Sequence, residues 1–279
     1  VDLNYGKFPF SDRIMYDSEE HNRTNVTVKT AFALSSNVGI SRLANQMYQK
    51  DPSKYTQHLI ESGITKETGI ELAGERKPVF KLDPKNKNEW YGTTVPWMSV
   101  GYELELTPLQ LLTYYNGIAN DGKMMKPYLV QETQQYGVTL QETEPVVLNE
   151  KLASESTIKK LQECLFAVVD SGTAKQIKND YYQFAGKTGT AKVVENKVYS
   201  DKYLASFAGY FPYDVPKYSI VVMVHSPSNH VYYGGAVAAP VFREIADKVY
   251  SHFINIREPI NNTNTQYVGV DAKARGYAY

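Results

Sequence analysis

The chain has 279 residues, 42% of them hydrophobic, which is enough for one large domain or two ordinary ones with a real core. Its 30 basic residues balance its 30 acidic residues, so the net charge of zero argues against a global basic field for nucleic acid and against an acidic disordered chain. The single cysteine excludes disulfides within the chain, and the 5 histidines show no metal-ligand spacing. We therefore expect no metal and no other cofactor.

The ends of the chain suggest part of something longer. No apolar run is long enough to span a bilayer. The first residues, Val1 to Asn4, have neither a start methionine nor a signal-like apolar segment. We therefore expect a soluble piece of a longer protein.

The first part of the chain predicts helices around a polar junction. Residues 1–24 are polar and turn-rich without a clear period, so an irregular lead-in is expected. A short helix capped by Thr27 should run to Leu34, and a second helix follows at once. The apolar face of the second helix is Val38, Ile40, Leu43, Ala44 and Met47. The junction Ser35 to Asn37 therefore places short polar side chains where they can point into a cleft.

Further helices are predicted up to residue 169. Pro52 to Ser62 should form a helix that ends at Gly63, and residues 69–88 a turn-rich connection. Thr107 caps a helix that begins at Pro108 and ends at residues 120–122. Short strand-like alternations at 128–130 and 145–148 follow, and then a helix from a Ser154 cap to Val169.

The last third predicts a sheet. The strand-like runs 184–194, 205–211 and 218–224 have no helix between them, so they should pair antiparallel. A final helix, about 236–252, is predicted to pack Val241, Ile245 and Val249 against this sheet. Residues from Glu258 onward look like a linker or a frayed end. Helices followed by a sheet indicate an α+β fold.

The strand from Phe184 to Val194 carries unusual polar residues. Alternation places Lys187 and Gly189 on one face, and Thr188 and Thr190 on the other. A glycine inside a strand is tolerated when a ligand or another backbone comes close, so Gly189 is the candidate for such an approach. From these residues alone, two readings stay open: an active-site wall, or a core strand with a bulge at Gly186 and a surface lysine.

Two motifs together resemble a known family. Ser35-x-Asn37 at a helix junction, followed by Lys187-Thr188-Gly189-Thr190 on a strand, resembles two of the three motifs of penicillin-binding proteins and serine β-lactamases. Segments 107–110, 119–122, 185–191, 207–212 and 234–242 also resemble class B penicillin-binding protein transpeptidase domains. The likeness covers roughly residues 25–250.

The resemblance implies a fold and a domain organisation. The fold would be α+β and penicillin-binding protein/serine β-lactamase-like, with an antiparallel sheet flanked by helices. Residues 1–24 would be a lead-in, 25–252 the C-terminal part of the transpeptidase domain, and 253–279 a linker or tail. The family sheet has five strands and the first two precede the nucleophile. The strand 218–224 should therefore lack a neighbour here, which leaves an exposed edge.

The resemblance also implies roles in serine acyl transfer. Ser35 would relay a proton in a network with Lys187, and Asn37 would hydrogen-bond the amide of the substrate. The hydroxyls of Thr188 and Thr190 would hold the terminal carboxylate of a D-Ala-D-Ala stem peptide or of a β-lactam. The Thr190 N–H would be half of the oxyanion hole, and the substrate would add a strand beside Gly189.

The third family motif, the nucleophilic Ser-x-x-Lys, does not occur upstream of Ser35. The one match, Ser156 to Lys159, lies between the other two motifs, in the first turns of an amphipathic helix. Helix start and solvent explain both side chains there. We therefore expect the nucleophile upstream of Val1 and a fragment that cannot acylate.

The implied activity is peptidoglycan cross-linking by a serine-type D,D-transpeptidase. Residues 96–102 and 126–127 resemble division-type members more than elongation-type ones. The implied partners are stem peptides, β-lactam antibiotics and divisome membrane proteins, with no nucleic acid. A membrane anchor would lie upstream, and the domain would act on the periplasmic side of the bacterial cytoplasmic membrane. The alternatives are a D,D-carboxypeptidase or β-lactamase of the same fold, or a non-catalytic β-lactam sensor or divisome scaffold.

Overall fold

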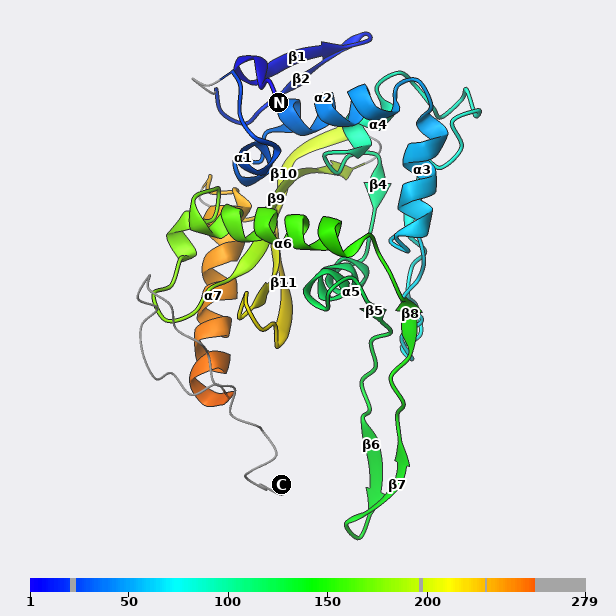
Figure 1. Cartoon of the computed structure of the whole chain (residues 1–279), viewed down its shortest axis with the longest axis vertical. Helices are drawn as coiled ribbons and strands as arrows, with labels where there is room; N and C mark the ends of the chain where they lie inside the picture. The colour runs from blue at the N-terminus through cyan, green and yellow to red at the C-terminus, as the bar shows by residue number, and fades with distance from the viewer. Residues whose placement is uncertain (21–23, 196–197, 229, 254–279) are drawn as a thin grey trace.

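A three-stranded antiparallel sheet forms the centre of the fold (Figure 1). The structure is a computed structural model that describes residues 1–20, 24–195, 198–228 and 230–253. The middle strand is β10 (Val198–Phe211), with β9 (Ala185–Glu195) on one side and β11 (Tyr218–His225) on the other. Both pairs are antiparallel, and Ala208 lies opposite Lys187 and Val221. The sequence prediction of an antiparallel sheet in an α+β fold is confirmed.

Helices cover both faces of this sheet. On one face, Phe207 and Phe211 of β10 pack in an aromatic core with Phe242 of α7 (Gly234–Phe253). On the other face, Tyr210 packs with residues of α5 (Pro108–Ala119) and α6 (Glu155–Asp170). Residues four apart in a strand share a face and neighbours oppose it, so β10 alone sets the two layers.

The face of α7 that contacts the sheet was predicted correctly at Val249, which packs against the core, and wrongly at the other two positions. Val241 and Ile245 are 42% and 40% exposed, whereas Phe242 is fully buried. The other buried hydrophobic residues of this face are Ala238, Ala239, Ala246 and Tyr250. Small alanines let the helix approach the sheet closely while one aromatic ring fills the core, a pattern that a search for branched aliphatic residues does not detect.

A second group of helices lies beside the sheet. Its members are α1 (Val28–Ala33), α2 (Asn37–Tyr48), α3 (Pro52–Glu61) and α4 (Thr94–Met98). The predicted caps are present, since the side chains of Thr27, Thr107 and Ser154 each accept a hydrogen bond from a backbone N–H three residues on. Thr107 forms a full capping box with Gln110. Local side-chain chemistry therefore defines where these helices begin.

The first residues are not irregular as expected. After the short 3-10 helix η1 (Asn4–Gly6), the strands β1 (Lys7–Phe10) and β2 (Arg13–Tyr16) form a tight hairpin with Lys7 opposite Tyr16. Phe10 and Met15 are buried with Val38 of α2. The hairpin is thus stabilised by tertiary burial, which the sequence period does not reveal.

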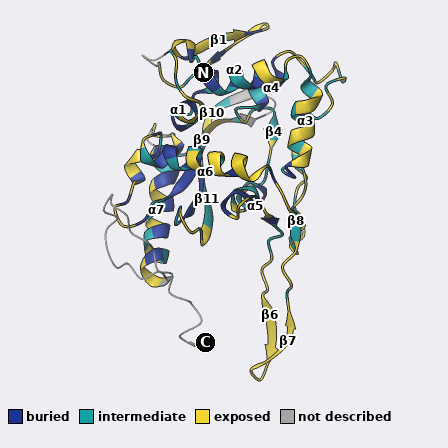
Figure 2. Cartoon of the chain, viewed as in Figure 1, coloured by how far each residue is buried: buried dark blue, intermediate teal, exposed yellow. Residues whose placement is uncertain are grey.

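The segment from 124 to 149 contains a second hairpin, which projects from the body of the domain (Figure 1). Its strands β6 (Glu132–Gln135) and β7 (Val138–Glu142) are exposed at every residue (Figure 2). The strand predicted at 128–130 is absent, whereas that at 145–148 corresponds to β8 (Val147–Asn149). The remaining short elements are β3 (Val79–Phe80) with β4 (Leu104–Glu105), β5 (Met124–Met125) with β8, and η2 (Lys175–Ile177).

No helix in the described part of the chain combines the length and apolarity needed to cross a membrane. The linker or tail expected after residue 253 lies outside the described residues.

Candidate active site

Ser35 occupies a strained turn between α1 and α2. Its φ is 57°, a left-handed conformation that is uncommon for a serine. The turn is closed by hydrogen bonds from Ser35 N to Phe32 O at 3.0 Å and from Ser36 N to Ala31 O at 2.9 Å. Strained backbone of this kind concentrates at functional sites, where surrounding structure holds it in place.

Lys187 meets this turn from β9. Its Nζ donates hydrogen bonds to Ser35 Oγ at 2.7 Å and to its neighbour's carbonyl, Thr188 O, at 3.1 Å. The Phe32 ring lies 5.8 Å away, within cation–π range. Burial of the ammonium lowers the pKa of Lys187 to about 8. A lysine with such a pKa can exchange a proton near neutral pH.

These observations exclude the surface-lysine reading of β9. The pairing of β9 with β10 is regular from Ala185 to Lys192, without a bulge at Gly186. Lys187 points toward Ser35 and not into open solvent. Strand β9 therefore faces the α1–α2 turn and forms one side of the candidate active site.

The two threonines of β9 are held by neighbouring segments. Thr188 Oγ1 is hydrogen-bonded to Thr173 Oγ1 at 2.8 Å, and Gly234 N donates to Thr190 Oγ1 at 3.0 Å. Because a hydroxyl that accepts one bond still has its own proton to give, Thr190 remains able to donate to an anion. The geometry is consistent with threonine hydroxyls that donate hydrogen bonds to a carboxylate.

The turn after α6 contacts both the C-terminal end of α1 and strand β9. A Cβ on Gly172 would lie 2.3 Å from Ala33 O, so only glycine allows this approach. Thr173 N also donates to Ala33 O at 3.1 Å. The same turn thus contacts α1 through Ala33 and β9 through Thr188.

Gly189 has the close approach that its sequence position predicts, and the approaching atoms belong to the chain itself. A Cβ there would lie 2.5 Å from Ser206 Oγ, on the residue opposite in β10. The first turn of α7 is also close, since a Cβ on Gly234 would lie 2.3 Å from Gly189 O. Packing within the chain therefore disfavours a side chain at Gly189 unless the Ser206 hydroxyl rotates away. Among the described residues β9 pairs with β10 only, so its other edge is open to an added strand.

The side chain of Asn37 is bound to the N-terminal hairpin. As the first residue of α2, it donates from Nδ2 to Tyr16 O at 3.0 Å. Asp17 accepts from Ser36 Oγ at 2.7 Å and from Val38 N at 2.8 Å, which fixes the start of the helix. Sequence reasoning missed Asp17 and Thr173. An acidic residue that caps a helix 20 residues away leaves no local signal.

The rejected tetrad behaves as a helix start. Ser156 lies in the first turn of α6, with its Oγ 3.2 Å from that of the cap residue Ser154. Lys159 Nζ pairs with Glu155 at 2.6 Å on the solvent side. The predicted position of this tetrad in the first turns of a helix is confirmed.

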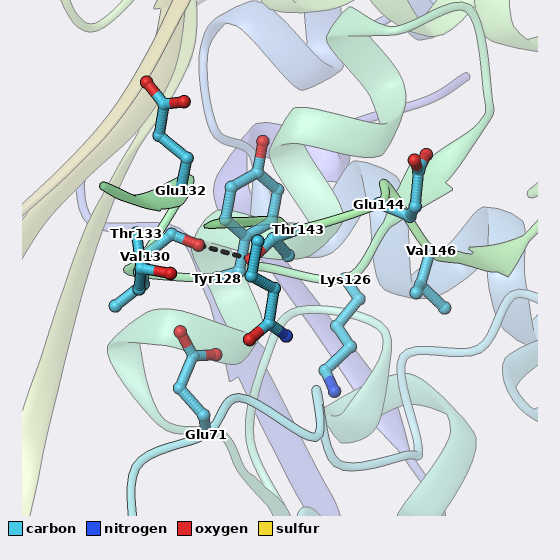
Figure 3. Close-up of a pocket in the computed structure, with 10 residues that line it drawn as sticks. Glu71, Lys126, Tyr128, Val130, Glu132, Thr133, Thr143, Glu144 and Val146 are labelled. Carbon is cyan, nitrogen blue, oxygen red and sulfur yellow. Dashed lines mark hydrogen bonds between the residues drawn. The ribbon is translucent and has the colours of Figure 1, made fainter. Parts of the chain in front are cut away.

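The described cavities lie away from these residues. One of about 330 Å³, at the root of the β6–β7 hairpin, is lined by Glu71, Lys126, Tyr128 and neighbours (Figure 3). Another of about 350 Å³ lies between β1, α2 and residues 90–95. The described residues contain no group of three or more side chains that could hold a metal ion.

Solved structures place this fold among penicillin-binding proteins. Apo penicillin-binding protein 3 of Mycobacterium tuberculosis superposes with a TM-score of 0.77 at 28% identity, covering 93% of this chain and 59% of that one. The same protein complexed with aztreonam gives a TM-score of 0.76. The predicted fold class is therefore confirmed.

A family model for the penicillin-binding protein transpeptidase domain matches residues 6–247, and the chain belongs to this family. Penicillin-binding protein PbpB of Mycolicibacterium smegmatis is 31% identical over 242 residues, which are 82% of this chain and 36% of PbpB. Peptidoglycan D,D-transpeptidase FtsI of Escherichia coli is 32% identical over 226 residues, 80% of this chain and 35% of FtsI. The chain spans little more than a third of the length of these relatives.

Proposed function

We propose that the protein containing this chain cross-links peptidoglycan as a serine D,D-transpeptidase, and that β-lactams inhibit it. The observation that carries the proposal is the 2.7 Å hydrogen bond between Lys187 and Ser35, which joins two motifs 152 residues apart. Similarity to a protein named peptidoglycan D,D-transpeptidase FtsI supports the reaction. Similar structures in complex with aztreonam and with ampicillin support the inhibitor class.

Each site residue has a role that fits its geometry. In acyl transfer, the proton of the attacking serine must reach the leaving amine. Lys187 and Ser35 form a two-member relay for this proton, and Asn37 binds an amide of the substrate. Thr188 and Thr190 bind the terminal carboxylate, and the backbone N–H of Thr190 stabilises the oxyanion.

The proposal assigns the attacking serine to a Ser-x-x-Lys motif outside this sequence, since none precedes Ser35. Residues 25–252 then form the C-terminal part of the transpeptidase domain. We further propose a division role with divisome membrane proteins as partners, an upstream membrane anchor and action on the periplasmic side of the cytoplasmic membrane. The resemblance of residues 96–102 and 126–127 to division-type members supports the division role.

A fluorescent penicillin tests the proposal in two settings. The full-length protein should form one covalent adduct, and Ser35→Ala and Lys187→Ala should each slow its formation by at least about 100-fold. Ser156→Ala is the matched control and should leave the rate unchanged. The present chain alone should form no adduct.

Two results would contradict the proposal. A stoichiometric adduct on the present chain would show that a serine within it is the nucleophile. Release of D-alanine from stem peptides without cross-linked product would indicate a carboxypeptidase instead.

A further inference from the structure

A second site lies along α2, beyond the residues of the acyl-transfer site. We propose that the groove between β1, α2 and residues 90–95, here named the aromatic groove, binds the neutral sugar backbone to which the stem peptide is attached. The inference rests on the proposed function, because it extends the substrate of that site. The groove is lined by Phe8, Pro9, Phe10, Ser11, Asn45, Gln49, Pro52, Trp90, Tyr91, Gly92 and Val95.

The composition of the groove selects an uncharged ligand. None of its lining residues carries a charge, and four of them are aromatic. A pyranose ring presents C–H groups on its faces and hydroxyls around its rim. Aromatic side chains pack against the C–H faces, and neutral donors and acceptors form hydrogen bonds with the hydroxyls. The volume of about 350 Å³ is within the range of small-molecule sites.

Polar groups are available at the rim. Asn45 of α2 and Gln49, the residue that caps its C-terminus, lie one helical turn apart, and Asn45 Nδ2 donates a long hydrogen bond of 3.4 Å to Gln49 Oε1. Each amide can donate and accept, as a sugar hydroxyl also does. Within the described ranges, neither Gln49 Nε2 nor the Trp90 indole N–H donates a hydrogen bond, so both remain free for a ligand.

The walls are preformed. Phe10 is buried and its ring packs edge-on against Trp97 at 6.1 Å. Tyr91 is fixed by hydrogen bonds from its N–H to Thr94 Oγ1 at 3.0 Å and from its hydroxyl to Asn88 O at 2.8 Å. A ligand therefore enters without ordering these rings, which lowers the entropic cost of binding.

The position of the groove favours a sugar over a proline-rich peptide, the other ligand that aromatic grooves accept. Two of the three segments that form the groove also lie at Asn37: α2 begins there, and Tyr16 O of the β1–β2 hairpin accepts a hydrogen bond from Asn37. Asn45 and Gln49 follow Asn37 by about 12 and 18 Å along the helix axis, at about 1.5 Å per residue. An extended peptide spans such a distance in about four to six residues, at about 3.3 Å each. A peptide that binds beside Asn37 and runs along α2 would therefore bring its attached sugar to the groove.

Chitotriose, a neutral β-linked trimer of N-acetylglucosamine, is the probe. In the 279-residue chain, Trp97→Phe leaves Trp90 as the single tryptophan, so its fluorescence reports binding to this chain. Titration should change the emission saturably. The double variant Asn45→Ala/Gln49→Ala in that background should raise the Kd at least about tenfold, since it removes two neutral hydrogen-bonding groups. Gln46→Ala, on the same helix but outside the groove, is the matched control and should leave the Kd unchanged.

Other outcomes overturn the inference. If a ten-residue polyproline peptide binds with Trp90 quenching and chitotriose does not, the groove is a peptide site. If neither binds, or if the double variant binds chitotriose as well as the parent, the assignment is wrong. Circular dichroism of each variant distinguishes lost binding from lost folding. Failure of chitotriose to bind while the full-length protein still acylates refutes the groove alone, whereas failure to acylate refutes the proposed function.

Discussion

Replacement of Lys187 by methionine should stabilise the fold while it abolishes function. The pKa falls from the ordinary value of 10.5 to about 8 because the ammonium is buried. At about 1.4 kcal/mol per pH unit, this costs up to about 3 kcal/mol of stability at neutral pH. Replacing the lysine removes this cost but leaves the Ser35 hydroxyl without its partner, which offsets about 1–3 kcal/mol of the gain. Methionine keeps the length of the side chain without the charge, so Lys187→Met should raise the free energy of unfolding by about 1 kcal/mol at pH 7.

Urea unfolding of the chain at several pH values tests this reasoning. Between pH 8 and 10.5 the unfolded chain holds a proton that the folded chain has released, so wild-type stability should rise across this window. Lys187→Met should lose that rise. Lys192 is an exposed lysine on the same strand, so Lys192→Met is the control. It should change neither the free energy of unfolding at pH 7 nor its rise between pH 8 and 10.5. A Lys187→Met variant that is less stable than wild type by more than about 1 kcal/mol, with a neutral control, would refute a desolvated lysine.

Three further predictions concern the frame of the site. Gly189→Ala should destabilise the chain by about 1–3 kcal/mol through its clash with Ser206 Oγ. In a double-mutant cycle of urea unfolding, Ser206→Ala should restore most of this loss. If the effects of the two substitutions are additive, another contact is responsible. Gly172→Ala should displace Ala33 and slow penicillin acylation of the full-length protein, measurable beside the unchanged rate of Gly137→Ala in the exposed hairpin. In the chain alone, amides of β11 should exchange with deuterium faster than those of β10, because one edge of β11 is unpaired among the described residues; uniform protection at low concentration would show that this edge is covered.

Helix starts were predictable because their chemistry is local. Thr27, Thr107 and Ser154 each satisfy a free N–H within three residues, so sequence spacing alone identifies them. The antiparallel sheet followed from strand runs without crossover helices. These features depend on neighbours in the chain, and that is the information a sequence pattern holds.

Features that depend on distant partners were not predictable in this way. The β1–β2 hairpin forms because Phe10 and Met15 pack against Val38 of α2. No periodic pattern within residues 7–16 indicates this distant contact. The face of α7 follows from how closely alanines let it approach Phe207, not from its most hydrophobic residues. Likewise, the Lys187–Ser35 contact was expected from family resemblance, since no spacing rule joins residues 152 apart.

The site gathers several unfavourable features at one point, and this concentration is itself evidence of function. Ser35 adopts a left-handed backbone, and Lys187 buries an ammonium that water would solvate better. Either feature alone could be an accident of packing. The two residues are in direct contact at 2.7 Å, and the turn at Gly172, which tolerates no side chain, holds α1 close to β9. Three separate segments, the α1–α2 turn, β9 and the turn after α6, therefore maintain a costly arrangement. A fold under selection for stability alone would place an apolar side chain at this position, so the buried cation supports the proton transfer proposed above.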